Sequence, residues 1–292
     1  MKILLIVLAV LAAVVLILWG FLLRCRRKNP AWRVLKQYRY AHRGLHNKPT
    51  VPENSLAAFR AAVEYGLGAE LDVHLLADGN LAVIHDSSLK RTAGADVEIE
   101  DLTAEDLKKY PLEESTEIIP LLDEVLPLFE GTTPLVIEVK VARGNADALC
   151  QTLAKKLDGY KGDYCIESFD PRAVRWFRVN RPQVCRGQLA ENFFKSHDND
   201  LPWLLRFAGT NLLSSCWTQP DFIAYKFEDR KNWSLRLCRL LWKPMELSWT
   251  IRTQEDLDTA EREGKLPIFE KFIPKDANTS PREACPGQPM SV

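Results

Sequence analysis

The sequence predicts an α/β protein, a TIM (β/α)8 barrel preceded by one N-terminal transmembrane helix. Three observations lead to this prediction. An uncharged apolar segment opens the chain, short β-type runs alternate with helical patterns over residues 38–273, and no GxGxxG or P-loop motif favours an open nucleotide-binding sheet. The 292 residues are 46% hydrophobic and 27% charged, which excludes a disordered chain and suffices for a large core.

The opening segment is long enough to cross a bilayer. Residues 3–23 carry no charge, and as a helix they would span ~31 Å against a hydrocarbon core of ~30 Å. A cleaved signal peptide is the rival interpretation, but the segment continues through Trp19 and Phe21 into a basic run with no small-x-small cleavage site. We therefore expect residues 1–28 to form an uncleaved transmembrane anchor with a basic collar.

The net charge of zero is an average over two unlike parts. Lys plus Arg and Asp plus Glu both number 39, which argues against nucleic-acid binding by bulk electrostatics. Residues 1–28 contain five basic groups and no acidic ones, so the remaining chain carries 34 basic and 39 acidic groups, a net charge of −5. The predicted anchor is thus cationic, and the rest of the chain, which we call the body, is mildly acidic.

Flanking charge and cysteine usage both favour a cytoplasmic body. Four basic residues follow the apolar segment, against Lys2 and the terminal amine before it, which the positive-inside rule associates with the cytoplasm. The seven cysteines are odd in number, scattered and free of CxxC spacing. This usage suits free thiols in a reducing compartment better than a disulfide framework or a zinc site.

The body is expected to contain nine strands separated by helices. The predicted strands cover residues 38–42, 69–74, 81–85, 135–139, 164–168, 184–188, 222–225, 245–250 and 267–269. Helix starts are indicated by Asp170-Pro171 and by Thr253. We expect a barrel domain over residues 38–273 and an unstructured polar tail over residues 274–292.

Two carboxylates and a histidine alternate with apolar residues in GAELDVHLLADG. Glu70, Asp72 and His74 share one face of the predicted strand, and the intervening apolar residues share the other. In a barrel the polar face points toward the axis. Burying two like charges side by side is costly without a neutralising cation, and hard carboxylate oxygens favour Mg²⁺ or Ca²⁺ over Zn²⁺.

A third carboxylate occurs in PLVIEVKVA. Glu138 and Lys140 lie two residues apart on an otherwise apolar strand, so both side chains should point toward the axis. Taken alone, this pattern is explained better by a Glu–Lys ion pair. Together with Glu70 and Asp72, it predicts that Glu138 completes a metal site and that Lys140 provides positive charge for an anionic substrate.

Two histidines follow predicted strands. His42 closes the first strand and His85 closes the run at residues 81–85, so we expect both at the same end of the barrel as a general acid and base. Arg43, next to His42, is suited to bidentate contact with phosphate oxygens.

Several motifs resemble the glycerophosphodiester phosphodiesterase family. They are HRG at 42–44, PENS at 52–55, the Glu70-x-Asp72 strand, HD at 85–86, LKRTAG at 89–94 and IEVK at 137–140, with weaker matches in ESFDP at 167–171 and SWTIRTQEDL at 248–257. The resemblance is densest over residues 40–140 and extends over 38–273. It implies a TIM barrel that uses one divalent cation, Mg²⁺ or Ca²⁺.

The resemblance also implies individual roles. Glu70, Asp72 and Glu138 match metal-binding positions, and His42 and His85 match the acid–base pair. Three further residues match phosphate-contacting and substrate-lining positions: Arg43, Lys140 and Trp249.

Three further residues, Asn54, His74 and Glu270, lie in or near the matched motifs. Asn54 is expected to cap the first helix of the barrel, as Asn does before helices. The parts played by His74 and Glu270 stay open, because the sequence departs from the family pattern around both.

The expected reaction is metal-dependent hydrolysis of a glycerophosphodiester to an alcohol and sn-glycerol 3-phosphate at the surface of a membrane. Lysophospholipase D-type or phospholipase C-like action on membrane lipids is the alternative, and a non-catalytic binder of lipid head groups is a third. Four tryptophans between residues 203 and 242 fit either an acyl-binding groove or ordinary packing. The sequence leaves the oligomeric state open.

Overall fold

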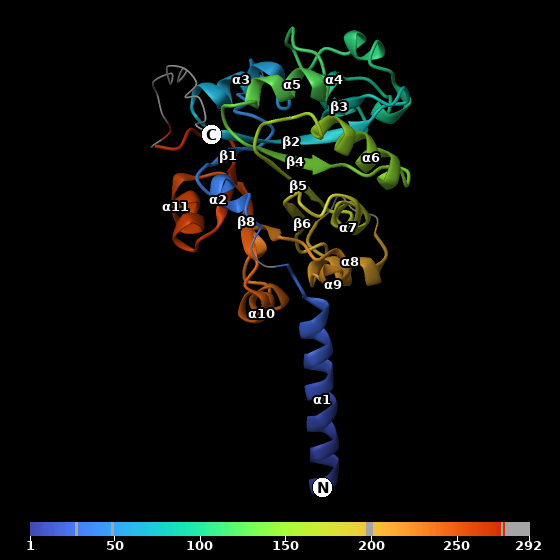
Figure 1. The fold of residues 1–292 in the computed structure, drawn as a ribbon, viewed down its shortest axis with the longest axis vertical. Helices are drawn as coiled ribbons and strands as arrows, with labels where there is room; N and C mark the ends of the chain where they lie inside the picture. The colour runs from blue at the N-terminus through green and yellow to red at the C-terminus, as the bar shows by residue number, and fades with distance from the viewer. Residues whose placement is uncertain (27–28, 48–49, 197–200, 276, 278–292) are drawn as a thin grey trace, which may run out of the picture.

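Eight parallel strands close into a barrel. The computed structural model describes residues 1–292 apart from 27–28, 48–49, 197–200, 276 and 278–292. β1 pairs with both β2 and β9, which closes the ring in the order β1-β2-β4-β5-β6-β7-β8-β9 (Figure 1). The ring strands are β1 Tyr40–Ala41, β2 Gly68–Leu75, β4 Leu135–Val139, β5 Tyr164–Ser168, β6 Arg186–Ala190, β7 Phe222–Lys226, β8 Met245–Ile251 and β9 Leu266–Phe269. The predicted barrel is confirmed.

One predicted strand lies outside the ring. β3, Leu81–Val83, pairs antiparallel with the end of β2 as a hairpin. The amide of Leu76 donates to the carbonyl of Asn80, and Gly79 in the turn has a φ of +83°. A turn this short cannot carry a parallel crossover. The expectation that His85 ends a neighbouring barrel strand is therefore wrong, although the returning chain still brings it to the same end of the barrel.

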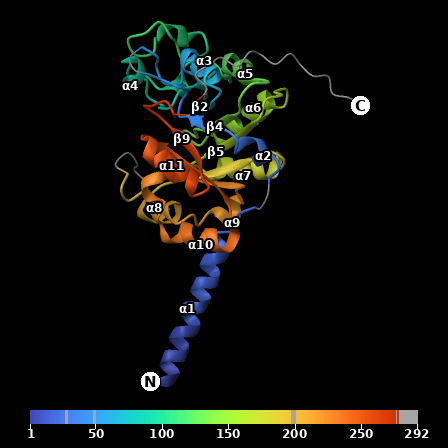
Figure 2. The same ribbon diagram turned by 90° about the vertical axis from the view of Figure 1, so that its left-hand side faces the viewer.

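Helices surround the barrel and begin largely where capping residues predict (Figure 2). Ser55, Asp170 and Thr253 each accept a hydrogen bond from a backbone amide of the first helical turn. The longer helices are α3 Leu56–Glu64, α5 Leu122–Phe129, α6 Ala146–Leu157, α7 Pro171–Asn180, α8 Trp203–Thr210, α10 Trp233–Trp242 and α11 Gln254–Arg262. Shorter ones are α2 Trp32–Leu35, α4 Lys90–Ala93, α9 Ser215–Thr218 and the 3₁₀ turns η1 Ile99–Asp101, η2 Asp106–Lys109 and η3 Phe227–Asp229.

Successive side chains along β2 point alternately to the outside and the inside of the barrel, as its sequence indicates. Leu71 and Val73 of β2 pack outward in the main core with Phe59 of α3 and Phe129 of α5. The residues between them point to the inside of the barrel, where β2 carries acidic groups. The main hydrophobic core therefore lies between strands and helices, while a second apolar cluster, which includes Tyr40, Val136 and Ile268, lies inside the barrel with the polar groups.

Residues 76–121 form an insertion between β2 and α5. It contains β3, α4, η1 and η2, and has its own apolar cluster, which includes Ile84, Leu89, Ile99 and Leu107. The insertion covers one side of the barrel near the end of β2 (Figure 1). It carries His85.

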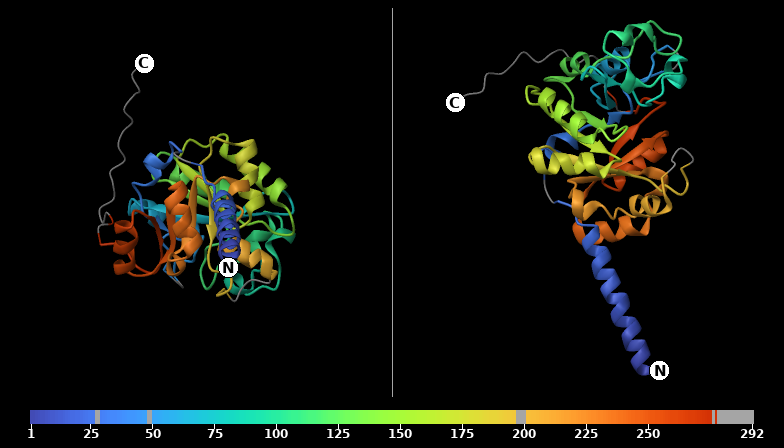
Figure 3. Two further views of the ribbon diagram at one scale, coloured as in Figure 1. Left: turned by 90° about the horizontal axis from the view of Figure 1, so that it is seen from below. Right: turned by 90° about the vertical axis from the view of Figure 1, so that its right-hand side faces the viewer.

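Helix α1, Lys2–Leu22, projects away from the barrel (Figures 1 and 3). It is long and apolar enough to span a membrane, with a mean hydropathy of 3.2, and only 6% of its most apolar stretch is buried. A signal sequence passes the same test of length and composition. The six described cysteines are all free, and Cys285 lies outside the described residues.

Candidate active site

A cavity of about 210 Å³ opens at the C-terminal ends of the barrel strands. Six of the eight predicted site residues line it, while Asp72 and Lys140 lie behind its wall. The lining residues are His42, Arg43, Glu70, His85, Glu138, Glu167, Phe169, Leu189, Lys226, Trp249, Thr250, Arg252 and Ile268. The barrel thus brings together residues from β1 to β9 that are far apart in the chain.

Carboxylates gather on three adjacent strands. Asp72 of β2 lies opposite Glu138 of β4, which lies opposite Glu167 of β5, and Glu70 lies one pleat before Asp72. Glu70, Asp72 and Glu138 each offer an oxygen, and these oxygens lie within 4.8 Å of one another. Glu167 was not predicted as a site residue, although its position in the apolar run CIESF was a signal of the same kind.

The buried negative charge exceeds the positive charge beside it. Four carboxylates, each at most 7% exposed, have two Lys or Arg cations beside them in the described part of the chain, Arg43 and Lys140. Burial, with the charges of Asp72 and Glu138, raises the pKa of Glu70 well above its usual value. One divalent cation would balance this excess, and the clustered carboxylate oxygens are its preferred ligands. The residues present therefore fit such an ion.

The two cations hold the carboxylates in place. Lys140 Nζ lies 3.0 Å from a Glu138 oxygen and 3.2 Å from Asp72 Oδ1, so the Glu–Lys ion pair exists inside the cluster. Arg43 donates from its backbone amide to Glu70 at 3.0 Å and from its guanidinium to Glu53 at 2.7 Å.

His42 is oriented by Glu270. Its Nδ1 lies 2.7 Å from Glu270 Oε2, and its Nε2 lies 3.9 Å from Glu70. Burial lowers the pKa of His42 to about 4, even though the Glu270 hydrogen bond raises it. The ring is therefore neutral at pH 7, with Nε2 directed at the carboxylates. Arg252 contacts the other oxygen of Glu270 at 2.8 Å.

His85 has a carboxylate partner of its own. Its Nδ1 lies 2.6 Å from Asp86, which Arg91 also contacts. His74 does not join the carboxylate cluster, because its ring lies between Glu100, at 2.7 Å, and the backbone carbonyl of His85, at 3.2 Å. His74 therefore supports the segment that carries His85.

Asn54 does not cap a helix. Ser55 is the N-cap of α3, and the Asn54 side chain donates to Asp72 Oδ2 at 2.9 Å. The Asn54 φ of +55° accompanies an inward side chain whose NH2 group donates to the buried Asp72, whereas an N-cap would use the side-chain oxygen to accept a backbone amide. The capping prediction was wrong by one residue, and Asn54 belongs to the site.

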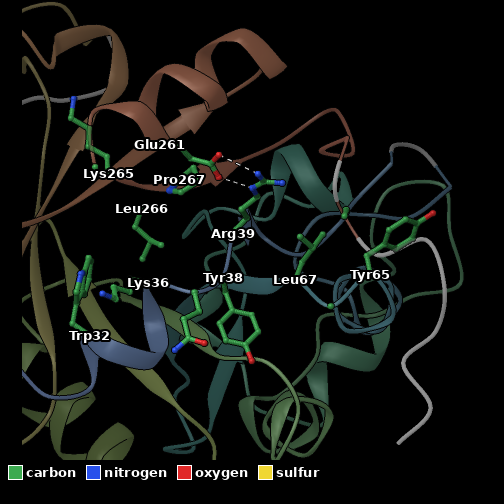
Figure 4. A pocket seen from close by; sticks show the side chains of 14 residues that line it. Trp32, Lys36, Tyr38, Arg39, Tyr65, Leu67, Glu261, Lys265, Leu266 and Pro267 are labelled. Atoms are coloured by element: carbon green, nitrogen blue, oxygen red, sulfur yellow. Dashed lines mark hydrogen bonds and ion pairs between the residues drawn. The ribbon is translucent and has the colours of Figure 1, made fainter.

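A larger cavity, of about 590 Å³, lies at the opposite end of the barrel (Figure 4). It is lined by residues that precede β1 and β9, among them Arg39 and Lys265. Glu261 in its wall is paired with Arg39 at 2.6 Å, as the dashed lines in Figure 4 show. The carboxylates and histidines described above are all at the other end.

The barrel, with acidic and histidine side chains at the C-terminal ends of its strands, is typical of an enzyme of the TIM-barrel class. The model of the glycerophosphoryl diester phosphodiesterase family matches residues 42–228. The chain belongs to this family.

Curated relatives match over part of their length. A glycerophosphodiester phosphodiesterase of Caldanaerobacter subterraneus subsp. tengcongensis is 38% identical over 159 residues, which are 51% of this chain and 65% of the relative. A lysophospholipase D of Rattus norvegicus is 36% identical over 125 residues, 38% of each chain. The matched part thus spans less than two thirds of these relatives.

Solved structures share the fold. A phosphodiesterase of Oleispira antarctica, in complex with the product sn-glycerol-3-phosphate, superimposes with a TM-score of 0.67 at 20% identity and covers 84% of this chain and 95% of that one. A glycerophosphodiester phosphodiesterase of Thermotoga maritima has a TM-score of 0.59 at 23% identity and covers 80% of this chain and 94% of that one.

Proposed function

We propose that this protein is a metal-dependent phosphodiesterase that hydrolyses glycerophosphodiesters to an alcohol and sn-glycerol 3-phosphate. One observation carries the proposal: a cluster of buried carboxylates shares a cavity with two histidines, each held by a carboxylate at Nδ1. Membership of the family and the names of its relatives support this activity.

Glu70, Asp72 and Glu138 would hold one divalent cation, Mg²⁺ or Ca²⁺. Such an ion supplies Lewis-acid stabilisation of charge on phosphoryl oxygens. Asn54 and Lys140 keep Asp72 in position through contacts of 2.9 and 3.2 Å.

Arg43 and Trp249 both line the cavity, on the segment after β1 and in β8, two strands away around the ring. We assign Arg43 to the phosphate, because its guanidinium stays charged and can offset the negative oxygens. Lys140 adds positive charge behind it, and Trp249 offers a flat apolar face to the alcohol portion.

His42 and His85 would move the protons. One accepts a proton at Nε2 from the nucleophile, a water or a glycerol hydroxyl, as the oxygen–phosphorus bond forms. The other donates a proton to the leaving alkoxide as its bond to phosphorus breaks. Where the nucleophile is a glycerol hydroxyl, the product of this step is a cyclic phosphate, which water would then open with the two proton transfers reversed. Glu270 and Asp86 hold the Nδ1 side of the two rings, so Nε2 is the reacting nitrogen of each.

A lysophospholipid is the second candidate substrate. Phe169, Leu189 and Ile268 give the cavity apolar lining, and one relative is named a lysophospholipase D. The volume of about 210 Å³ is below the ~300–1,000 Å³ of pockets that enclose drug-sized ligands. The soluble head-group diester therefore comes first. Phospholipase C-like cleavage has less support, and simple head-group binding would not require two oriented histidines.

The activity is tested with the full-length protein and glycerophosphocholine, following the products by ³¹P NMR. We expect choline and sn-glycerol 3-phosphate, and a loss of roughly 10²- to 10⁴-fold in kcat for His42→Ala and for His85→Ala. Glu261→Gln, at the other end of the barrel, is the matched control and should keep full activity. Full activity of either histidine variant would exclude the acid–base pair.

The same assay with lysophosphatidylcholine separates the two substrates. Faster release of choline from the lysolipid would favour the lysophospholipase D activity, and release of phosphocholine instead would indicate phospholipase C-like cleavage.

We also propose that α1 anchors the protein with the barrel on the cytoplasmic side. The basic collar and the six free cysteines support this orientation. Protease added to intact cells should leave the barrel undigested, and digestion from outside would contradict it. Residues 1–28, 38–273 and 274–292 remain the proposed division into anchor, barrel and tail, and most of the tail lies outside the described residues.

A further inference from the structure

The barrel exposes large apolar side chains on one surface. We call this surface, formed by the outer faces of α8 and α10 with adjacent loop residues, the apolar base. It consists of Phe194, Leu201, Trp203, Leu204, Leu205, Trp233, Leu240 and Leu241. Trp203 and Leu204 are each 66% exposed and Leu240 is 72% exposed. A patch with several such neighbours is unusual on a surface that faces water.

The apolar base surrounds the point where α1 meets the barrel. Figures 1, 2 and 3 show α8 and α10 beside the upper end of α1. The ring of Trp19 packs on Trp233 at 4.7 Å and on Phe207 at 5.7 Å, and Phe207 stacks on Trp203 at 5.5 Å. An aromatic row thus runs from α1 across both helices.

The joint between α1 and the barrel is made by specific contacts. Trp19 Nε1 donates to Ser234 Oγ at 3.0 Å, and Trp242 Nε1 donates to the carbonyl of Gly20 at 2.8 Å. Gly20 lies so close to α10 that a Cβ there would meet Leu241 at 2.9 Å. These contacts hold α1 at one orientation relative to the barrel.

The residues after α1 belong to the folded body. Leu23 is fully buried and Cys25 nearly so, in a cluster with Ile223, Tyr225 and Leu235. Cleavage near the end of α1 would open this cluster. The packing therefore supports retention of α1 as the anchor, on which the following inference depends.

We propose that the apolar base lies in the interface of the same bilayer that α1 spans. If α1 crosses the membrane, the apolar base is brought to the membrane surface. Tryptophan is favoured at that depth. Four tryptophans lie at the joint and the adjoining apolar base: Trp19, Trp203, Trp233 and Trp242. Arg236 lies one turn from Trp233 on the exposed face of α10, where it can meet lipid phosphates.

The proposal explains how the reaction site is held relative to lipid. Phe193, beside Phe194 of the apolar base, packs on Phe169 in the cavity wall at 5.9 Å. The barrel would therefore lie at a fixed distance from the bilayer. The cavity wall that contains Phe169 would connect through Phe193 to the membrane-facing side of the barrel.

Tryptophan fluorescence tests this placement independently of catalysis. The full-length protein is reconstituted in vesicles of phosphatidylcholine or of phosphatidylcholine brominated on its acyl chains, and the quenched fraction is compared. Trp203→Phe should lower the quenched fraction, as should Trp19→Phe. Trp176→Phe is the control and should not lower the quenched fraction. Trp176 lies on α7, where its Nε1 donates to Asp147.

Added tryptophans give a test that does not depend on the aromatic row. The extra fluorescence of Leu240→Trp should be quenched by the brominated lipid. The extra fluorescence of Lys108→Trp, on the exposed side of the insertion, should not be quenched.

The possible outcomes distinguish insertion of α1 into the bilayer from contact between the apolar base and the bilayer. If Trp203→Phe and Leu240→Trp behave like their controls while Trp19→Phe lowers quenching, α1 spans the bilayer and the apolar base faces water or another protein, which overturns the proposal. Absence of quenching from Trp19 as well would overturn the anchor too. Hydrolysis of glycerophosphocholine is measured separately, so failure of the proposed function is distinguishable.

Discussion

At the scale of residues, each histidine in the cavity depends on a carboxylate behind it. Glu270 engages Nδ1 of His42, and Asp86 engages Nδ1 of His85. A carboxylate at Nδ1 fixes the ring and leaves Nε2 for the substrate. Burial raises the pKa of Glu270, but the bonds from His42 and Arg252 outweigh it and lower the pKa to about 2, so Glu270 is ionised throughout the neutral range.

Glu270→Gln should lower kcat for glycerophosphocholine by about 10²-fold, because the amide no longer holds His42 at its reactive angle. KM should change little, since Glu270 is not proposed to touch the substrate. Steady-state kinetics check this, with Glu261→Gln as the control carboxylate. An unchanged kcat would show that His42 does not need Glu270.

The main site residues were predictable from the sequence, and their partners were not. Glu70, Asp72 and Glu138 are recognisable because charged residues at alternate positions of apolar strands are rare. Asn54 and Glu270 follow no such rule. Asn54 bonds Asp72 because of its positive φ, and Glu270 meets His42 only because β9 closes the barrel beside β1.

At the scale of elements, the insertion after β2 determines where His85 lies. β3 turns back along β2 instead of joining the ring, and the amide of Ile84 donates to the carbonyl of Asp72 at 3.1 Å. His74, at the far end of β2, then binds the carbonyl of His85. The hairpin thus joins one proposed catalytic residue to the strand that carries the proposed metal ligands.

His74→Ala should lower kcat by roughly 10- to 100-fold through displacement of His85. It should leave the affinity for divalent cations unchanged, because His74 does not contact the carboxylate cluster. Kinetics and metal titration of the same preparation provide the two readouts. A parallel loss of metal affinity would contradict a role confined to His85.

Strand positions were predicted well because apolar β-type runs bounded by turns are local patterns. Residues 135–139 and 164–168 agree with β4 and β5 at both ends. The direction of residues 81–85 was misjudged, although the Asp78-Gly79 pair before them is a hairpin signal. The direction in which two strands pair depends on the length of the segment that connects them. The alternation of β-type runs and helical patterns does not take that length into account.

At the scale of the whole molecule, the end of α1 and the barrel share one apolar cluster. The cationic leader and the acidic body are distinct in composition. Arg26 nevertheless lies 3.5 Å from the buried Asp221, and its amide donates to the carbonyl of Pro220. Composition divides the chain at residue 28, whereas packing joins the end of α1 to β7 and α10.

Leu23→Ala should reduce the stability of the barrel by roughly 2–5 kcal/mol, because it leaves a cavity in a fully buried site. Leu18→Ala, within α1 and 58% exposed, should cost about 0.5 kcal/mol or less. Thermal unfolding of the full-length protein in detergent micelles compares the two. Equal stabilities would mean that α1 is only tethered to the barrel.

The central claim, that the carboxylate cluster holds a catalytic divalent cation, is tested most directly by calorimetric titration of Mg²⁺ or Ca²⁺ into the metal-free protein. We predict one ion per chain and recovery of glycerophosphocholine hydrolysis in proportion to occupancy. Glu138→Gln should weaken binding by more than the roughly 10- to 100-fold typical of outer-shell substitutions. Full hydrolysis by the metal-free protein, or unchanged binding in Glu138→Gln, would contradict the claim.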